Sequence, residues 1–352
     1  MLAAYVSGHG YGHLTRLCEV LRAVRTRAPR LPITIVGTVP EPLVRRAVPG
    51  DLTLRRVACD VGLVQRDALV IDEPATAARC AAFDATWDAR LADEVAFLRE
   101  SGTRAVLGDL PPLAFAAARA AGVPGLALGN FSWDWIYRHL SVREPSLAAH
   151  ADRAARAYAG TDLLLELPFT GDVSVFPRRE RIGLVARRPR VERAEARRRL
   201  GLDARPAVLV SFGGVGLPGL DRARLAEERG LSWILPEDVR TGRLDALGLD
   251  YPDVIGAADA VVTKPGYGIV SDCVAAGTPL VYTDRGDFPE YPVLVREMVR
   301  LLPCVHVPGD DVRAGRIGDA VRRVLAAGRP GAGAMDLGGA ERGAARVLEA
   351  VR

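Results

Sequence analysis

Short apolar runs alternate with amphipathic stretches along the whole chain. In the first half, apolar runs of strand length are separated by stretches in which apolar residues recur at helical spacing. This alternation predicts βαβ units and a mainly parallel sheet with helices on both faces. We expect strands at 3–6, 33–36, 52–57, 105–107, 126–128 and 163–165, and helices near 14–27, 75–99 and 112–121.

The pattern restarts after the Pro/Arg-rich stretch 186–189, which is typical of a domain boundary. We therefore expect two Rossmann-like α/β domains, residues 1–185 and 186–352, facing a central cleft, with the last helix able to pack back on the first domain. Ligands of such folds bind at the carboxyl ends of the strands. The second half predicts strands at 207–212, 233–235, 260–263, 280–283 and 305–307, and two closing helices from about 310.

Composition excludes several classes of protein. With 352 residues, 49% of them hydrophobic, the chain can form two cores. The sequence contains neither a signal-peptide pattern nor an apolar run of membrane-spanning length, so we expect a cytoplasmic protein without stable membrane insertion. Five scattered cysteines without a CxxC pair argue against disulfides or a zinc site. The net charge of +4 comes from arginines spread over the chain, which argues against nucleic-acid binding.

The second half contains the only lysine of the chain, Lys264, in the stretch VVTKPGYGIVSD (261–272). A strand is predicted to end at Thr263 and a helix to begin after the turn. The N–H groups and dipole of a helix start favour an anion such as a diphosphate, and Gly266 and Gly268 permit its close approach. Asp272 could accept hydrogen bonds from ribose hydroxyls. The alternative is an ordinary strand-to-helix turn with a surface lysine.

Two further glycine-rich turns follow predicted strands. Gly213 and Gly214 in SFGG (211–214) could admit a phosphate or a sugar. In SGHGYGH (7–13), Gly10 and Gly12 would allow close approach, and His9 and His13 offer imidazoles that titrate in the range useful for proton transfer. We prefer His13 as the base because it lies at the predicted helix start.

Asp109 follows a predicted strand in AVLGDLPPL (105–113), where it could orient a histidine or act as a base. It could equally cap the following helix, whose first turn Pro111 and Pro112 would suit. Farther along, NFSWDWIY (130–137) concentrates aromatic residues. These could form a sugar-stacking wall, although a buried structural cluster is favoured slightly.

Together these motifs resemble GT-B-fold glycosyltransferases of the family 28 type. The likeness is greatest to the glycosyltransferase-like N-terminal region of plant L-arabinokinase. The likeness covers most of the chain. One residue departs from it, because the family 28 pattern usually has glutamate where this chain has Asp272. The likeness to the arabinokinase region rests on GHGYGHLTR (8–16), CDVGLVQRDALVID (59–72), GDLPPLA (108–114), GNFSWDWIY (129–137) and KPGYGIVSD (264–272).

The resemblance implies a metal-independent enzyme that moves a sugar from a nucleoside-diphosphate sugar to an acceptor hydroxyl. The C-terminal domain would hold the donor and the N-terminal domain the acceptor, with His9 and His13 beside the reacting carbon. Donor contacts are implied for Gly213, Gly214, Lys264, Gly266, Tyr267, Gly268, Asp272, Asp287 and Glu290.

The sequence leaves two alternatives open. One is a nucleotide-sugar epimerase or hydrolase, which needs no acceptor. The other is a non-catalytic regulatory protein that binds a sugar or a nucleotide, because the fold does not by itself determine the activity.

Overall fold

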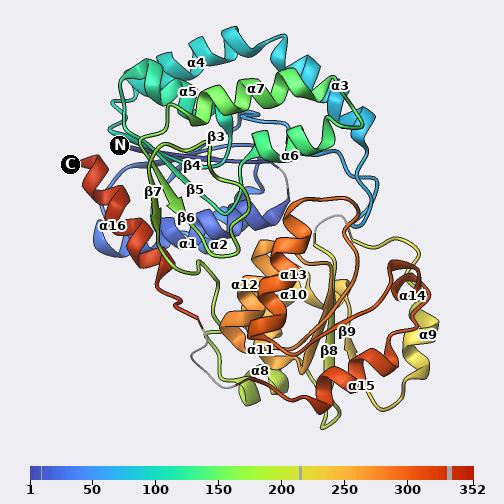
Figure 1. The fold of residues 1–352 in the computed structure, drawn as a ribbon. Helices are drawn as coiled ribbons and strands as arrows, with labels where there is room; N and C mark the ends of the chain where they lie inside the picture. The colour runs from blue at the N-terminus through green and yellow to red at the C-terminus, as the bar shows by residue number, and fades with distance from the viewer. Residues whose placement is uncertain (9, 214–215, 331–334) are drawn as a thin grey trace. The chain divides into compact units, whose positions relative to one another are not determined.

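The computed structural model describes residues 1–8, 10–213, 216–330 and 335–352. Contacts divide the chain into two compact units, which are considered separately below (Figure 1). The first unit comprises Met1–Val64, Asp72–Val185 and Asp336–Arg352, and the second comprises Gln65–Ile71 and Ala186–Met335. The segment Gln65–Ile71 thus belongs to the second unit, although it lies within the stretch that the sequence assigns to the first domain.

The first unit is built on a seven-stranded sheet in which every neighbouring pair is parallel, in the order β3-β2-β1-β4-β5-β6-β7. Its central strands are fully buried, as expected for a parallel sheet covered on both faces. The strands are β1 (Leu2–Val6), β2 (Ile33–Val36), β3 (Thr53–Arg55), β4 (Ala105–Asp109), β5 (Gly125–Gly129), β6 (Leu163–Glu166) and β7 (Arg179–Arg181).

Helices cover both faces of this sheet (Figure 1). The C-terminal helix α16 packs against α1 on one face, and α5 packs against α4 and α7 on the other. The helices are α1 (Tyr11–Arg27), α2 (Glu41–Ala47), α3 (Glu73–Asp84), α4 (Trp87–Glu100), α5 (Pro112–Ala121), α6 (Trp133–Leu140), α7 (Leu147–Tyr158) and α16 (Gly339–Val351).

The second unit repeats the architecture with a five-stranded parallel sheet in the order β12-β11-β10-β8-β9. Its strands are β8 (Ala207–Ser211), β9 (Ser232–Ile234), β10 (Ala260–Thr263), β11 (Leu280–Tyr282) and β12 (Cys304–His306). Its helices are α8 (Arg193–Arg199), α9 (Arg222–Glu227), the 3₁₀ helix η1 (Pro236–Val239), α10 (Thr241–Leu247), α11 (Tyr251–Ala257), α12 (Tyr267–Ala276), α13 (Glu290–Leu301), α14 (Gly309–Arg313) and α15 (Gly318–Ala326).

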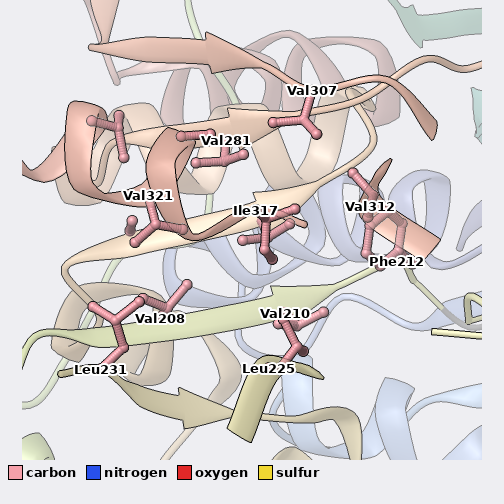
Figure 2. Close-up of a cluster of buried hydrophobic side chains, with 14 of the residues drawn as sticks. Val208, Val210, Phe212, Leu225, Leu231, Val281, Val307, Val312, Ile317 and Val321 are labelled. Carbon is pink, nitrogen blue, oxygen red and sulfur yellow. The ribbon is translucent and has the colours of Figure 1, made fainter. Parts of the chain in front are cut away.

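One apolar core of the second unit lies between this sheet and helices α9, α14 and α15 (Figure 2). Burial of these side chains removes apolar surface from water, which is the main favourable contribution to folding. Ala68 and Leu69 from the segment Gln65–Ile71 belong to the same core. Its other members include Val208, Val210, Phe212, Leu225, Leu231, Val281, Val307, Val312, Ile317 and Val321.

The α/β class predicted from the apolar pattern is confirmed, and most strands lie within two residues of their expected positions. Several elements differ, and helices α2, α6, α7, α10 and α11 were not predicted. The stretch 75–99 forms two helices, α3 and α4, and the end of the chain forms three helices rather than two. The pattern also missed β7, because an edge strand of sequence Arg-Glu-Arg carries no apolar signal. Within the described residues, no helix has the length and apolarity needed to span a membrane.

Candidate functional site

The first candidate half-site lies at the carboxyl ends of β1 and β4. Neighbouring β1 and β4 run parallel, and the order of strands reverses between them, which is where open α/β sheets bind ligands. β4 ends at Asp109, and the turn after β1 leads into α1, whose first turn contains His13. The Asp109 carbonyl accepts a hydrogen bond from the Ser7 N–H, 3.2 Å, which fixes the two turns together.

His13 and Asp109 form a buried pair. The His13 Nδ1 lies 2.7 Å from the Asp109 Oδ1. Because a carboxylate oxygen accepts, the hydrogen lies on Nδ1, and the ring nitrogen able to take up a proton is Nε2. The contact of 3.2 Å between Arg16 Nη2 and the same Nδ1 is then not a hydrogen bond, since both nitrogens carry hydrogens.

Arg16, one turn after His13, neutralises the carboxylate. Its Nε lies 2.5 Å from Asp109 Oδ2 and its Nη2 lies 2.7 Å from Oδ1, a bidentate geometry. Burial raises the pKa of Asp109, but the charges and hydrogen bonds of Arg16 and His13 outweigh it and lower the pKa overall. Asp109 therefore stays ionised and orients His13. Arg16 Nη1 also donates to the Oδ1 of buried Asn130, 2.8 Å.

Backbone strain surrounds this network. Leu110 and Phe169 are the non-glycine residues with positive φ in the described chain, at 69° and 61°. Leu110 directly follows Asp109, and the Phe169 carbonyl accepts from Asn130 Nδ2, 3.3 Å. A side chain at Gly129 would collide with Leu110, because a Cβ there would lie 2.6 Å from its Cδ1. Strain of this kind is often found at functional sites.

A second carboxylate, Asp60, lies next to this network. Its Oδ1 accepts from the Gly8 N–H, 3.3 Å, and its Oδ2 is buried without a hydrogen-bond partner among the described residues. Burial raises the pKa of Asp60, although a hydrogen bond to the Ser7 side chain and the charge of His13 oppose the shift. Asp60 is part of the motif at 59–72, but the sequence did not single it out.

The remaining N-terminal predictions have different outcomes. Gly10 caps α1 with φ 74°, a conformation that strains other residues. A Cβ at Gly10 or Gly12 would meet no atom within 4 Å in the described part of the chain, apart from its chain neighbours. His9 lies outside the described residues. Trp133 and Tyr137 are buried, and their stacked rings have centroids 5.6 Å apart. They are therefore core residues and not an exposed sugar-stacking wall.

The second candidate half-site lies at the carboxyl edge of the other sheet, around Lys264. The Lys264 Nζ donates a hydrogen bond to the Ala68 carbonyl, 2.6 Å. Burial, and next the positive charge of Arg285, lowers the pKa of Lys264 to about 7. The sole lysine is thus a partly desolvated cation on a neutral backbone acceptor.

The turn after Lys264 has the predicted form. α12 begins at Tyr267 with Gly266 as its N-cap, and among the described residues, chain neighbours aside, no atom lies within 4 Å of a Cβ built at Gly266 or at Gly213. Gly268 lies in the first turn of α12, where the N–H groups have no acceptor inside the helix. The Tyr267 side chain is buried, so only its backbone is available to a ligand. Gly214 lies outside the described residues.

Asp272 has a different partner from the predicted ribose. It is 2% exposed, and its carboxylate accepts from the Arg187 N–H, 2.9 Å, from Nε, 3.0 Å, and from Nη2, 2.5 Å. Burial raises the pKa of Asp272, and Arg187 only partly offsets this. The carboxylate therefore holds the start of the second unit against α12. A ribose contact would require Arg187 to be displaced.

The two acidic residues that the sequence predicted as donor contacts after β11 differ from each other. Asp287 is exposed, as expected of a ligand contact. Glu290 is buried and pairs with Arg285, 2.7 Å, whose guanidinium lies 4.0 Å from the centre of the Phe288 ring. Glu290 thus has a structural partner within its own loop.

Sequence reasoning missed Arg16, Asn130 as its partner, Asp60 and Arg187 as functional or supporting residues. A signal existed for Arg16, because it follows His13 by three residues and so lies on the same face of α1. No local signal existed for Arg187, whose partner lies 85 residues away.

No protein-family model matches the chain. A curated relative is L-arabinokinase of Arabidopsis thaliana, 30% identical over an alignment of 321 residues that covers 86% of this chain and 30% of the relative. The chain thus spans about a third of the length of the curated relative that it matches.

Solved structures similar over the whole chain are glycosyltransferases. UGT89C1 of Arabidopsis thaliana aligns with a TM-score of 0.65 at 13% identity, covering 100% of this chain and 99% of that one. The glycotransferase of kitacinnamycin aligns with a TM-score of 0.59 at 19% identity, covering 100% and 99%. UGT2 of Phytolacca americana, in complex with UDP-2-fluoro-glucose and pterostilbene, aligns with a TM-score of 0.59 at 15% identity, covering 99% and 94%. With its two parallel α/β units, the chain has the GT-B fold that these glycosyltransferases share.

Proposed function

We propose that the protein is a glycosyltransferase that moves a sugar from a nucleoside-diphosphate sugar to a hydroxyl of an acceptor. The observation that carries this proposal is the His13–Asp109 pair at the carboxyl ends of β1 and β4 in a chain of GT-B fold. The family 28 type of this fold remains part of the proposal.

In this reaction His13 is the general base. Its Nε2 takes the proton of the acceptor hydroxyl as the hydroxyl oxygen bonds to the anomeric carbon. The bond from that carbon to the phosphate oxygen breaks, and the nucleoside diphosphate leaves with the electron pair. Base catalysis of this kind contributes about 10² to 10⁴ in rate.

Asp109 and Arg16 support His13. Asp109 fixes the proton on Nδ1 and stabilises the imidazolium that forms, as the buried aspartate does in other histidine-dependent enzymes. Arg16 clamps both oxygens of Asp109 and so restrains the rotation of its carboxylate. The ring is therefore held in its reactive orientation before any substrate arrives.

The second unit binds the donor in this proposal. The first turn of α12 and Lys264 meet the charge of the diphosphate, and the open backbone at Gly213 and Gly266 lets the diphosphate approach closely. Preorganised positive groups of this kind stabilise the charge that develops on the leaving group. Asp287, whose side chain is exposed, is assigned to the sugar hydroxyls in this proposal.

A second candidate function is non-catalytic binding of a sugar or nucleotide. The observation that favours it is that three side chains predicted to contact the donor already have partners within the protein. Lys264 donates to Ala68, Asp272 accepts from Arg187, and Glu290 pairs with Arg285. A protein that kept these partners would have the backbone at the start of α12 to hold a ligand, without the side chains that the proposed transfer uses.

The experiment that separates these functions begins with a thermal-shift screen of UDP, GDP, dTDP and ADP sugars, since a ligand of the folded state raises the apparent stability. Release of the nucleoside diphosphate is then measured with the selected donor, with and without a panel of hydroxyl acceptors. Transfer predicts release that depends on the acceptor and a glycosylated product. Equal release without acceptor would indicate a hydrolase, and binding without release would indicate the regulatory function.

A further inference from the structure

Residues Gln65–Ile71 form a small hairpin, here called the 65–71 hairpin, within the second unit. Gln65 and Ile71 pair as an antiparallel bridge, and the Arg66 N–H donates to the Val70 carbonyl, 3.0 Å. At the tip, Asp67 Oδ1 accepts from the N–H groups of Leu69, 2.7 Å, and Val70, 3.0 Å. The hairpin thus has a defined conformation, although both of its ends continue into the first unit.

The tip of the hairpin is attached to the second unit in two ways. Ala68 is fully buried and Leu69 is 8% exposed, and both belong to the core formed with α14 and α15. The Arg313 Nη2 pairs with Asp67 Oδ2, 2.6 Å. The tip also lies close to the loop after β11, since a Cβ at Gly286 would lie 3.1 Å from the Leu69 carbonyl oxygen.

Through the attached tip, the uncharged Ala68 carbonyl contacts the Lys264 ammonium, which is the group proposed to bind the diphosphate. The Ala68 carbonyl, 2.6 Å from Lys264 Nζ, has only a partial negative charge. The guanidinium of Arg285, although paired with Glu290, further disfavours the charged form of Lys264. A half-buried ammonium in these surroundings is partly desolvated at some cost, and an anion would relieve that cost. The negative charge of Asp67 is already paired with Arg313. The Ala68 carbonyl thus occupies one of the three N–H donors of Lys264 that a diphosphate could otherwise use.

We propose, building on the donor site of the proposed function, that the 65–71 hairpin is an autoinhibitory strap of that site. It covers Lys264 when no donor is bound and moves off Lys264 when the diphosphate binds. Donor binding is therefore weakened, because part of its free energy is used to detach the tip. Any change that loosens the tip should increase the affinity for the donor.

The test loosens the tip without changing the net charge. In the double variant Asp67→Asn/Arg313→Gln the ion pair is lost, while the asparagine oxygen keeps the acceptor for Leu69 and Val70. The matched control, Asp311→Asn/Arg316→Gln, removes an ion pair of the second unit in which two Arg316 nitrogens donate to Asp311 Oδ1 and no atom of the described hairpin takes part. Calorimetric titration with inorganic pyrophosphate should show binding about five- to tenfold tighter for the first variant and unchanged for the control.

Hydrogen exchange of the wild-type protein gives an independent measurement. Pyrophosphate should speed the exchange of the Arg66, Leu69 and Val70 amides, which donate within the tip. Pyrophosphate that binds both proteins equally and leaves or slows this exchange would overturn the strap and leave the donor site intact. If neither the wild type nor the loosened variant binds pyrophosphate, both the donor site and the strap are overturned.

Discussion

The two candidate half-sites differ in what holds their charged groups. Around His13, the partners are side chains: a carboxylate, a guanidinium and an amide, joined at 2.5–2.8 Å. Around Lys264, the ammonium lies on a backbone carbonyl, and the nearby carboxylates are occupied by arginines of the same unit. For the proposed reaction, this comparison implies that the groups assigned to proton transfer are positioned in advance, whereas the groups assigned to donor binding must exchange internal partners for the ligand.

The largest effect is expected from Asp109→Asn, which breaks the first half-site. The amide no longer fixes the proton on His13 Nδ1, and Arg16 is left as a buried charge without its carboxylate. We expect turnover to fall about 10²- to 10⁴-fold and the free energy of unfolding to fall by about 3–5 kcal/mol. Steady-state kinetics and chemical denaturation measure the two effects.

The matched control is Asp319→Asn, which removes the exposed pair with Arg322. An exposed ion pair contributes about 1 kcal/mol or less, and turnover should not change. Turnover of Asp109→Asn within threefold of the wild type would contradict the orienting role of Asp109.

Lys264→Met breaks the second half-site. Since a hydrogen bond to a charged group is worth about 1.5–3 kcal/mol, pyrophosphate affinity should fall about 10- to 100-fold. The control Arg300→Met removes an exposed cation on α13 and should leave affinity unchanged. Equal affinity of Lys264→Met and wild type in the titration would rule out Lys264 as a diphosphate ligand.

The same lysine should make stability depend on pH. Its pKa is about 7 in the folded protein and 10.5 in the unfolded chain, so between these values only the unfolded chain holds the proton. Stability of the wild type should then rise with pH relative to Lys264→Met, by at most about 1 kcal/mol per pH unit. Denaturation curves from pH 7 to 10 check this difference. Parallel curves for the two proteins would show that Lys264 is not desolvated.

The smallest effect on binding is expected from Asp272→Asn, which tests whether this carboxylate has a structural partner or contacts the ligand. Because the Asp272 carboxylate binds Arg187, its loss should lower the free energy of unfolding while nucleoside-diphosphate affinity changes less than about threefold. Titration with the nucleoside diphosphate selected by the screen measures this. A loss of affinity above tenfold, with stability preserved, would restore the predicted ribose contact.

The fold could be predicted because its strands are apolar and regularly separated by helices. Strand 260–263 and helix 112–121 have the predicted bounds. The polar edge strand β7 could not be found in this way, because it pairs with one neighbour only and needs no apolar face.

The candidate site was only partly predictable. His13 and Asp109 follow strands at glycine- and proline-rich turns, and the structure brings them within 2.7 Å, while their roles remain predictions. Arg16 was not predicted as a site residue, because an arginine on a helix usually faces solvent. The partners of Asp272 and Lys264 lie 85 and 196 residues away, so no local pattern encodes them.

The most direct test of the account compares wild type with His13→Ala, using the donor and acceptor selected by the screen. The account predicts that both proteins bind the donor with equal affinity, whereas the variant forms the glycosylated product at least about a hundredfold more slowly. Product formation by His13→Ala at the wild-type rate would contradict it.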